Sequence, residues 1–473
     1  MRKTLLYLLL CALFLMSATL SRAEDDADTY MDSLYETGLP LVRIETVDAE
    51  WPTFNTVTHP DGMMGTTITD ATKVPGRIRV YDASGSVVYD SGSYVDNHSG
   101  MTVRVRGNTS ALSNPQPYKV KLQKKADLLC RGDKRFKDKN WLLLRQRDLT
   151  LMVGMKVGEL MEQPWTPQYQ YVNLLFNGDY LGIYALVESV RRNPACRIDV
   201  DDTGYVFEMD AYWWNTDVCI PSSLVPVLGY TFKYPDEEDI TQSQLDDFGQ
   251  YLQQVEASIR TSGYQDYIDV PSFANWLLSR DILGILDGGG SNMFFTKHDD
   301  TNDSKLMMGP LWDFDSAMCM EDNWDAVHDN PFWDMLFLHS DRTFFDAYYD
   351  RWLEVRESVV PDLLRFLDDF AASDYGMALN NSIALHNSRW QGDAPEFTDV
   401  PSLVVAARAY FERRATWLDA TLENINRLRG MYEKQDTDDN TIYRLDGTKA
   451  TPDNTYSLPR GIYVVGRRKF ITY

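Results

Sequence analysis

The sequence predicts an α+β fold, with an N-terminal antiparallel β region followed by a helical C-terminal lobe. Residues 39–105 contain short runs such as GRIRVYDA and MTVRVRG, which Gly, Asp, Asn and Pro separate. Their alternation of apolar and polar residues is typical of half-buried strands. After residue 341, apolar residues recur three and four positions apart in stretches such as RTFFDAYYDRWLEVRESV. This spacing indicates amphipathic helices, whose aromatic residues we expect to pack in a core.

The N-terminus predicts export. Residues 1–23 have a basic start, Arg2 and Lys3, then the apolar run LLYLLLCALFLM and a small-residue end, which favours a cleaved secretory signal peptide. A membrane anchor is the alternative, but the apolar run is short for a span. Lipidation at Cys11 is not expected, because Leu10 precedes it. We therefore expect a secreted or cell-surface protein with no membrane span in the mature chain, and a flexible lead-in over residues 24–38.

Charge and cysteine content exclude some classes. The formal net charge is −24, or −27 once the three basic residues of the signal segment are removed, which disfavours nucleic acid as a partner. The four cysteines after the signal permit up to two disulfides in three possible connectivities. They are Cys130, Cys196, Cys219 and Cys319. The chain has no C-x-x-C pair and its histidines are scattered, so we expect no structural zinc site.

The central stretch, residues 281–320, concentrates candidate catalytic groups. The helical run PSFANWLLSRDILGIL is predicted to stop at Asp287, because three glycines follow. Asn292 comes five residues later, and the runs MFFTKH and KLMMGPLW then predict a hairpin around the turn DDTNDS. The second run delivers Asp313 and Asp315 in the motif W-D-F-D.

This order of residues is what phosphoryl transfer requires. In protein kinases, an Asp accepts the proton of the attacking hydroxyl, and an Asn and a second Asp hold the metal ions. Asp287, Asn292 and Asp313 fit that arrangement. Two alternatives remain open: D-G-G-G as a plain turn, and Asp287 with Asp313 as the carboxylate pair of a glycoside hydrolase.

Cationic candidates lie on the N-terminal side. The turn that begins at Arg106, RGNTS, precedes the predicted strand YKVKL, which places Lys119 and Lys121 on one face. Such a turn and one of these lysines can contact phosphate oxygens. The alternative is a β-turn followed by two solvated lysines.

Further strands add two candidates. VNLLFNGDYLGIYALVESV predicts a hairpin with an Asn-Gly turn, and Glu188 ends its second strand. This Glu is expected to orient a nucleotide-site lysine or to contact the ribose, with an exposed strand-end charge as the alternative. GYVFEMDAY and YTFKYPDEED predict two more strands, the second carrying Lys233. Thr241 and Gln244 then form a capping box that opens an amphipathic helix.

These motifs, in this order, resemble the CotH kinase family of atypical secreted protein kinases. The resemblance rests on RGNTS, NPQPYKVKL, NWLLL, NGDYLGIYALVE, TFKYPDEED, D-x-x-x-x-N-x-F-F and GPLWDFD, and covers roughly residues 39–429. It implies a kinase-like fold that transfers phosphate from ATP, with a divalent metal, to Ser or Thr of an acceptor protein. One position departs from the family: Met152 or Val153 stands where relatives usually carry an Arg in the first turns of a helix.

The resemblance assigns roles to the candidates. Asp287 is the expected catalytic base, and the expected ligands of Mg²⁺ or Mn²⁺ are Asn292, Asp313 and Asp315. The expected ATP-binding residues are Arg106, Lys119, Lys121, Glu188 and Lys233. An inactive kinase-like surface protein that binds a protein or a glycan is the alternative function.

The expected organisation places the kinase-like domain at residues 106–430, after the β region at 39–105. Residues 431–473 differ from the preceding helices, with a polar stretch followed by two short β-like runs. Their pattern, Y-x-L-x-G followed by L-P-x-G-I-Y-V-V-G-R-R-K, resembles the C-terminal sorting modules of exported Bacteroidetes proteins. A hairpin that completes the main fold is the alternative.

Overall fold

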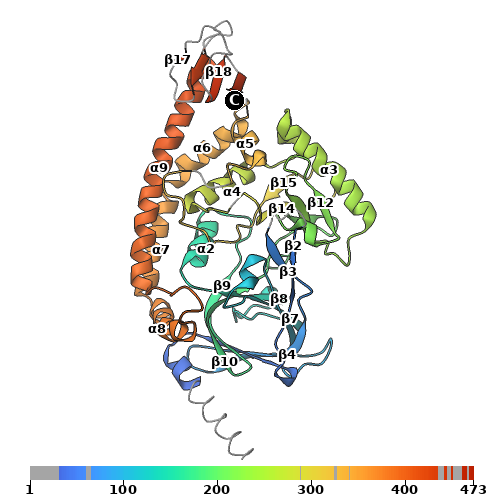
Figure 1. Ribbon diagram of the computed structural model, residues 1–473, viewed down its shortest axis with the longest axis vertical. Coiled ribbons are helices and arrows are strands. Elements are labelled where there is room, and N and C mark those ends of the chain that lie inside the picture. The colour runs from blue at the N-terminus through green and yellow to red at the C-terminus, as the bar shows by residue number, and fades with distance from the viewer. Residues whose placement is uncertain are drawn as a thin grey trace, which may run out of the picture.

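The computed structural model describes residues 31–59, 65–287, 289–323, 327–339, 341–434, 442–444, 449–450, 461–465 and 468–472. The expected signal peptide, residues 1–23, lies outside the described residues. The architecture is mixed α+β, with two sheets at the core and the helices gathered mainly toward one end (Figure 1). The α+β prediction is therefore confirmed.

The larger sheet has eight strands in the order β1-β9-β10-β8-β7-β6-β4-β5. Its strands are β1 (Leu41–Thr46), β4 (Val74–Tyr81), β5 (Val87–Asp90), β6 (Met101–Val105), β7 (Tyr118–Ala126), β8 (Asp138–Arg145), β9 (Tyr169–Phe176) and β10 (Asp179–Glu188). β4 pairs with β1 as well as with β6, so the sheet closes on itself. Alternate side chains point inward and form an apolar core around Val120, Trp141 and Tyr184.

The N-terminal β region is part of this closed sheet. β6 pairs with β7 in the register Val103↔Val120, and β1 pairs in parallel with β9. The region is therefore neither a separate module nor purely antiparallel. The described part of the expected flexible lead-in also differs from the prediction: residues 31–36 are helical and Leu34 is fully buried.

The predicted Asn-Gly hairpin is confirmed. Phe176 at the end of β9 pairs with Asp179 at the start of β10, so the turn has two residues. Asn177 and Gly178 both have positive φ, 50° and 87°, as a type I′ turn requires.

The second sheet carries the strands nearest the catalytic motifs. Its order is β12-β13-β11-β14-β15. The strands are β11 (Tyr205–Asp210), β12 (Cys219–Pro221), β13 (Gly229–Tyr234), β14 (Met293–Lys297) and β15 (Leu306–Met308). β14 and β15 form the predicted hairpin, with Phe295 opposite Met308. A separate pair, β2 (Asn55–Thr58) and β3 (Thr66–Thr69), lies nearby.

The α-helices follow the predicted apolar periodicity. They are α2 (Thr150–Leu160), α3 (Gln242–Arg260), α4 (Val270–Leu283), α5 (Pro331–Phe337), α6 (Thr343–Val355), α7 (Val359–Ala372), α8 (Asp374–Arg389) and α9 (Val400–Lys434). Short 3₁₀ turns lie at Val47–Ala49, Thr109–Leu112, Lys134–Phe136, Trp213–Asn215 and Tyr264–Asp266. The predicted capping box of Thr241 and Gln244 opens α3. Trp276 and Trp333 stack in the interior with ring centroids 5.2 Å apart, so aromatic residues of these helices pack as expected.

Helix α4 ends earlier than predicted. Its last residue is Leu283, and Gly284 adopts the left-handed conformation (φ 55°, ψ 57°) and donates its backbone N–H to Arg280 and Asp281. An added Cβ at Gly284 would lie 1.9 Å from the Tyr410 hydroxyl. The helix therefore stops at this glycine, and Asp287 lies in a turn three residues beyond it.

The C-terminal strands form a sheet of their own. α9 runs along one side of the molecule and ends at Lys434, four residues beyond the expected end of the kinase-like domain at residue 430 (Figure 1). Beyond it are β16 (Ile442–Arg444), β17 (Lys449–Ala450), β18 (Gly461–Val465) and β19 (Arg468–Thr472), in the order β17-β16-β18-β19. Within the described residues, these strands pair only with one another.

Two further observations bear on the sequence-based expectations. Cys130, Cys196, Cys219 and Cys319 are all free, so the disulfides that the cysteine count permits are not formed. Across the residues described, no helix is both long and apolar enough to cross a membrane.

Candidate active site

A cleft of about 1470 Å³ is lined by residues of both sheets and by the central stretch of the chain. Seven of the nine predicted site residues line it: Arg106, Lys119, Lys233, Asp287, Asn292, Asp313 and Asp315. Groups that lie up to 209 positions apart in the sequence, Arg106 and Asp315, therefore meet in one cavity. Lys121 and Glu188 are not part of its lining.

Asn292 and Asp313 are in direct contact. The Asn292 side-chain amide donates to Asp313 Oδ2 at 3.0 Å, and the Asn292 backbone N–H donates to Glu208 Oε1 at 3.1 Å. Both Asn292 (φ 64°) and Asp313 (φ 61°) have left-handed backbone conformations. Non-glycine residues in this region are uncommon and cluster at functional sites. The W-D-F-D loop and the start of β14 are thus both shaped to bring these side chains together.

The acidic groups destabilise one another's charges. Burial, reinforced by the carboxylates of Asp315 and Asp287 and opposed by Arg106, raises the pKa of Asp313 to about 7. Burial and the nearby Asp148 also raise the pKa of Asp315. A cation placed here would relieve this repulsion.

The donor set fits a divalent cation. Among the described residues, no group of three or more His, Cys, Asp or Glu side chains is arranged to hold a metal. Asp313 and Asp315 instead offer two carboxylates, and Asn292 would add its amide oxygen once the amide that now donates to Asp313 turns over. Mg²⁺ is commonly held by one or two carboxylates together with substrate phosphates, so this smaller set suits it.

Asp287 is exposed at the cleft and is paired with a residue that the sequence analysis did not single out. The Ser316 hydroxyl donates to Asp287 Oδ1 and accepts from the Asp287 backbone N–H at 3.2 Å. Ser316 directly follows the W-D-F-D motif, and this adjacency is the sequence feature that could have marked it as a residue of the site.

The cationic side of the cleft is built on β7 and β13. Lys233 Nζ lies 2.9 Å from Glu208 Oε2. Burial lowers the pKa of Lys233, but Glu208 and Asp210 outweigh this and raise it above its usual value. Burial, reinforced by Arg104 and other nearby cations, lowers the pKa of Lys119 to about 7. Glu208 and Asp210 were missed, although E-M-D in a predicted strand places both on one face.

Lys119 and Lys121 share one face of β7, as predicted, but only Lys119 reaches the cleft. Lys121 is exposed and lies opposite Asn140 on β8, two residues along the strand from the Lys119↔Leu142 pair. The alternation of side chains along a strand predicts which face of the sheet a residue lies on. It does not predict how far along the strand the cleft extends, because that depends on the neighbouring elements.

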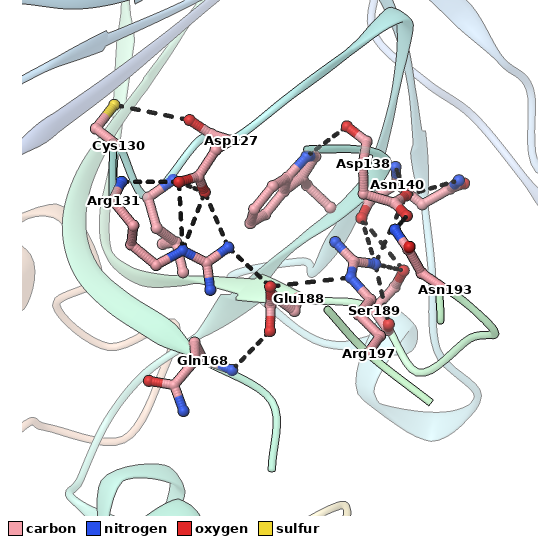
Figure 2. Close-up of polar contacts among 12 residues, drawn as sticks. Asp127, Cys130, Arg131, Asp138, Asn140, Gln168, Glu188, Ser189, Asn193 and Arg197 are labelled. Atoms are coloured by element: carbon pink, nitrogen blue, oxygen red, sulfur yellow. Dashed lines mark hydrogen bonds and ion pairs between the residues drawn. The ribbon is translucent and has the colours of Figure 1, made fainter. Parts of the chain in front are cut away.

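The expected pairing of Glu188 with a nucleotide-site lysine is wrong. Glu188 is fully buried, and Figure 2 shows Arg131 and Arg197 approaching it from two sides. Arg131 Nη2 donates to Oε1 at 2.8 Å, and the Gln168 backbone N–H donates to Oε2 at 3.1 Å.

Strand register explains this difference. Glu188 lies opposite Trp141, which lies opposite Val120, so all three point into the closed sheet. Lys119 is one residue before Val120 and points to the other face. The Glu188 cluster instead ties strand β10 to the neighbouring loops, because Arg131 also binds Asp127 and Arg197 also binds Ser189.

Helix α2 packs directly against the W-D-F-D loop. An added Cβ at Gly154 would lie 2.1 Å from the Phe314 ring, so only glycine permits this contact. Met152 and Val153, where the resemblance implies an Arg, are fully buried and apolar. Arg145 and Arg147, just before this helix, line the cleft and were not predicted.

Comparison with known proteins identifies the family of this chain. No match was found among curated proteins. The profile of the CotH kinase protein family matches residues 103–389, which is more than half of the chain and includes all nine predicted site residues. The chain therefore belongs to the CotH kinase family.

Proposed function

We propose that this protein is an exported, metal-dependent protein kinase that transfers the γ-phosphoryl group of ATP to Ser or Thr of an acceptor protein. Family membership suggests a phosphotransferase and implies ATP as the donor. The observation that carries the proposal is that Asp287, Asn292 and Asp313 line one cleft together with basic side chains. Acidic groups and cations in the same cleft suit a polyphosphate whose terminal group lies beside a metal and a base.

The cationic residues are proposed to neutralise the phosphates. Arg106, Lys119 and Lys233 all line the cleft, and Glu208 holds Lys233 in place at 2.9 Å. A lysine paired with a glutamate in this way contacts nucleotide phosphates in protein kinases. The proposal assigns this role to Lys233 with Glu208, in place of a lysine paired with Glu188.

Asn292 and Asp313 are proposed to hold the divalent cation, with Asp315 nearby. A bound metal supplies neutralisation of the charge that develops on the transferring group. Asp287 is exposed to the cleft and forms no ion pair within the described residues, and Ser316 binds its Oδ1. An acceptor hydroxyl is therefore proposed to bind the second carboxylate oxygen, Oδ2. We assign to it orientation of that hydroxyl and acceptance of its proton.

Export and sorting belong to the same proposal. Residues 1–23 supply the signal peptide, which leaves a mature chain from Glu24. Residues 431–473 supply a sorting module, and their strands pair apart from the two larger sheets. The expected location is therefore secreted or cell surface.

The test uses the mature chain with ATP, Mg²⁺ or Mn²⁺, and a Ser-rich acceptor peptide, with phosphate measured by mass spectrometry. We expect phosphate with the parent and a loss of at least about 100-fold with Asp287→Ala, the range typical of a general base. Asp303→Ala, an exposed carboxylate in the β14–β15 turn, is the matched control and should match the parent. Equal rates for parent and Asp287→Ala would refute the assigned role.

A second candidate is a kinase-like surface protein that binds a protein or a glycan without catalysis. The observation that favours it is the burial of apolar Met152 and Val153 where the resemblance implies an Arg. It predicts no rise in melting temperature on addition of Mg-ATP and no phosphate on any acceptor. The kinase proposal predicts both.

A further inference from the structure

Ser316 occupies the position at Asp287 that an acceptor hydroxyl would need. Its hydroxyl donates to Asp287 Oδ1, it lines the same cleft, and it follows Asp313 by three residues. Two other serine hydroxyls of the cleft bind elsewhere: Ser291 donates to Asp210 at 3.0 Å and Ser189 donates to the Asn140 carbonyl at 3.2 Å. Ser316 thus has the hydrogen bond that activates a nucleophilic hydroxyl.

We propose that Ser316 is a self-phosphorylation site, an inference that rests on the kinase function proposed above. In this step the Ser316 Oγ forms a bond to the γ-phosphorus of ATP. The bond from that phosphorus to the β–γ bridging oxygen breaks, the hydroxyl proton passes to the Asp287 carboxylate, and ADP leaves. No reactant other than Mg-ATP is needed.

The loop geometry makes the reaction intramolecular. Ser316 lies in an irregular segment between β15 and α5, and its carbonyl accepts from the Leu286 backbone N–H at 3.3 Å. The Ala317 N–H closes a turn onto the Phe314 carbonyl at 2.9 Å. These bonds hold Ser316 beside its own Asp287 and Asp313, so it meets the nucleotide bound in the same molecule.

The modification would be self-limiting. Phosphoserine carries a charge of about −1.5 to −2 at neutral pH, and here it would lie beside Asp287, Asp313 and Asp315. It would also fill the space at Asp287 that an acceptor hydroxyl requires. Phosphorylated protein should therefore phosphorylate acceptors more slowly than unmodified protein.

The experiment incubates the mature chain with Mg-ATP over a tenfold range of protein concentration and maps phosphate by peptide fragmentation. The tryptic peptide between Lys305 and Arg342 contains only two hydroxyl side chains, Ser316 and Ser340, so fragment ions separate them. We expect phosphate on Ser316 at a rate per molecule that does not depend on concentration. Asp313→Ala should remove this phosphate, and Ser316→Thr should carry it on the new hydroxyl.

A second arm measures acceptor phosphorylation after preincubation with Mg-ATP. The parent rate should decline several-fold as Ser316 phosphate accumulates, and the Ser316→Ala rate should stay constant in time, whatever its initial value. A Mg-ADP-induced rise in melting temperature shows that the cleft of each variant is intact. If Ser316→Ala lacks this rise, the phosphate sites mapped in the parent and in Ser316→Thr decide whether Ser316 is the self-phosphorylation site.

The outcomes separate the two proposals. A parent that phosphorylates the acceptor peptide but leaves Ser316 unmodified overturns the self-phosphorylation site and leaves the kinase function standing. A parent that phosphorylates neither overturns both. A Ser316 phosphorylation rate that rises with protein concentration overturns the intramolecular step.

Discussion

Lys233 on β13 and Glu208 on β11 form an ion pair of 2.9 Å on the wall of the cleft. The same Glu208 carboxylate accepts the backbone N–H of Asn292 at 3.1 Å. One side chain thus links a proposed phosphate contact to a proposed metal ligand. Positioning of this kind is what phosphoryl transfer most requires of a protein.

Replacing Glu208 should loosen both contacts. Glu208→Gln is expected to raise the KM for ATP about tenfold and to lower kcat, because Lys233 loses its ion pair and Asn292 a charged acceptor. Steady-state kinetics measure this change. Glu238→Gln, an exposed neighbour after β13, should match the parent. An unchanged KM for Glu208→Gln would contradict the assignment of Lys233 to the phosphates.

Asp313 should make stability depend on pH in a particular direction. Its pKa is raised to about 7 in the folded protein from an ordinary value of 3.8, so the folded state binds this proton more tightly than the unfolded chain. Its contribution to stability therefore falls as pH rises from about 4 to about 7, and the full cost is present above 7. The pKa of Asp315 is also raised, so ionisation of Asp315 also lowers the stability of the folded state as pH rises.

Asp313→Asn removes that cost because an amide does not ionise. Without metal, the variant should be more stable than the parent by about 1–2 kcal/mol at pH 8, after allowance for partial solvent exposure, and equal to it near pH 4. Saturating Mg-ATP should reverse the order at pH 8, because only the parent keeps the ligand carboxylate. Denaturant unfolding at both pH values measures this. A difference that is independent of pH would show that Asp313 is not destabilised by charge.

Gly154 should be intolerant of a side chain. Gly154→Ala places a methyl group against the Phe314 ring, which should cost about 1–3 kcal/mol of unfolding free energy and displace the W-D-F-D loop. Phosphate transfer should fall with it. Phe314→Leu in the same chain should recover part of the loss.

Gly249 provides the matched control for this prediction. It also lies inside a helix, α3, but an added Cβ there would meet only ordinary contacts at 3.8 Å. Gly249→Ala should therefore be neutral or stabilising by up to about 1 kcal/mol. Equal effects of the two substitutions would mean that helix propensity, and not the contact with Phe314, decides stability at Gly154.

Glu188 should prove structural. Glu188→Gln leaves the half-buried Arg131 and the buried Arg197 without their shared carboxylate, which should cost about 2–4 kcal/mol. The folded fraction should keep the KM of the parent for ATP. Glu159→Gln, which breaks a partly exposed pair with Lys156, should cost less than about 1 kcal/mol. A raised KM with unchanged stability would restore Glu188 to the nucleotide site.

Local features of the fold could be predicted from local sequence. The turn at Asn177 and Gly178, the capping box at Thr241 and the β14–β15 hairpin each depend on residues close together in the chain. The closure of the large sheet could not be predicted, because β1 pairs in parallel with β9 across more than 100 residues. The end of α4 was misplaced because Gly284, an isolated glycine, caps the helix before the three consecutive glycines.

The same limit applies to the site. Motif order predicted that Asp287, Asn292 and Asp313 belong to one site, and all three line the cleft. The partners of Lys233 and Asp287 could not be identified, because Glu208 and Ser316 reach them only through strand pairing and loop packing. Glu188 was misassigned because its face depends on the register of three strands, which the sequence alone does not specify.

The most direct test of the account is the rate of phosphate transfer from Mg-ATP to a Ser-rich acceptor by the parent and by Asp313→Ala. The account predicts metal-dependent transfer by the parent and a loss of at least about 1000-fold in the variant, because the ligand carboxylate is gone. The variant should retain the fold, as judged by its unfolding transition. Transfer by Asp313→Ala at the parent rate would contradict the central claim.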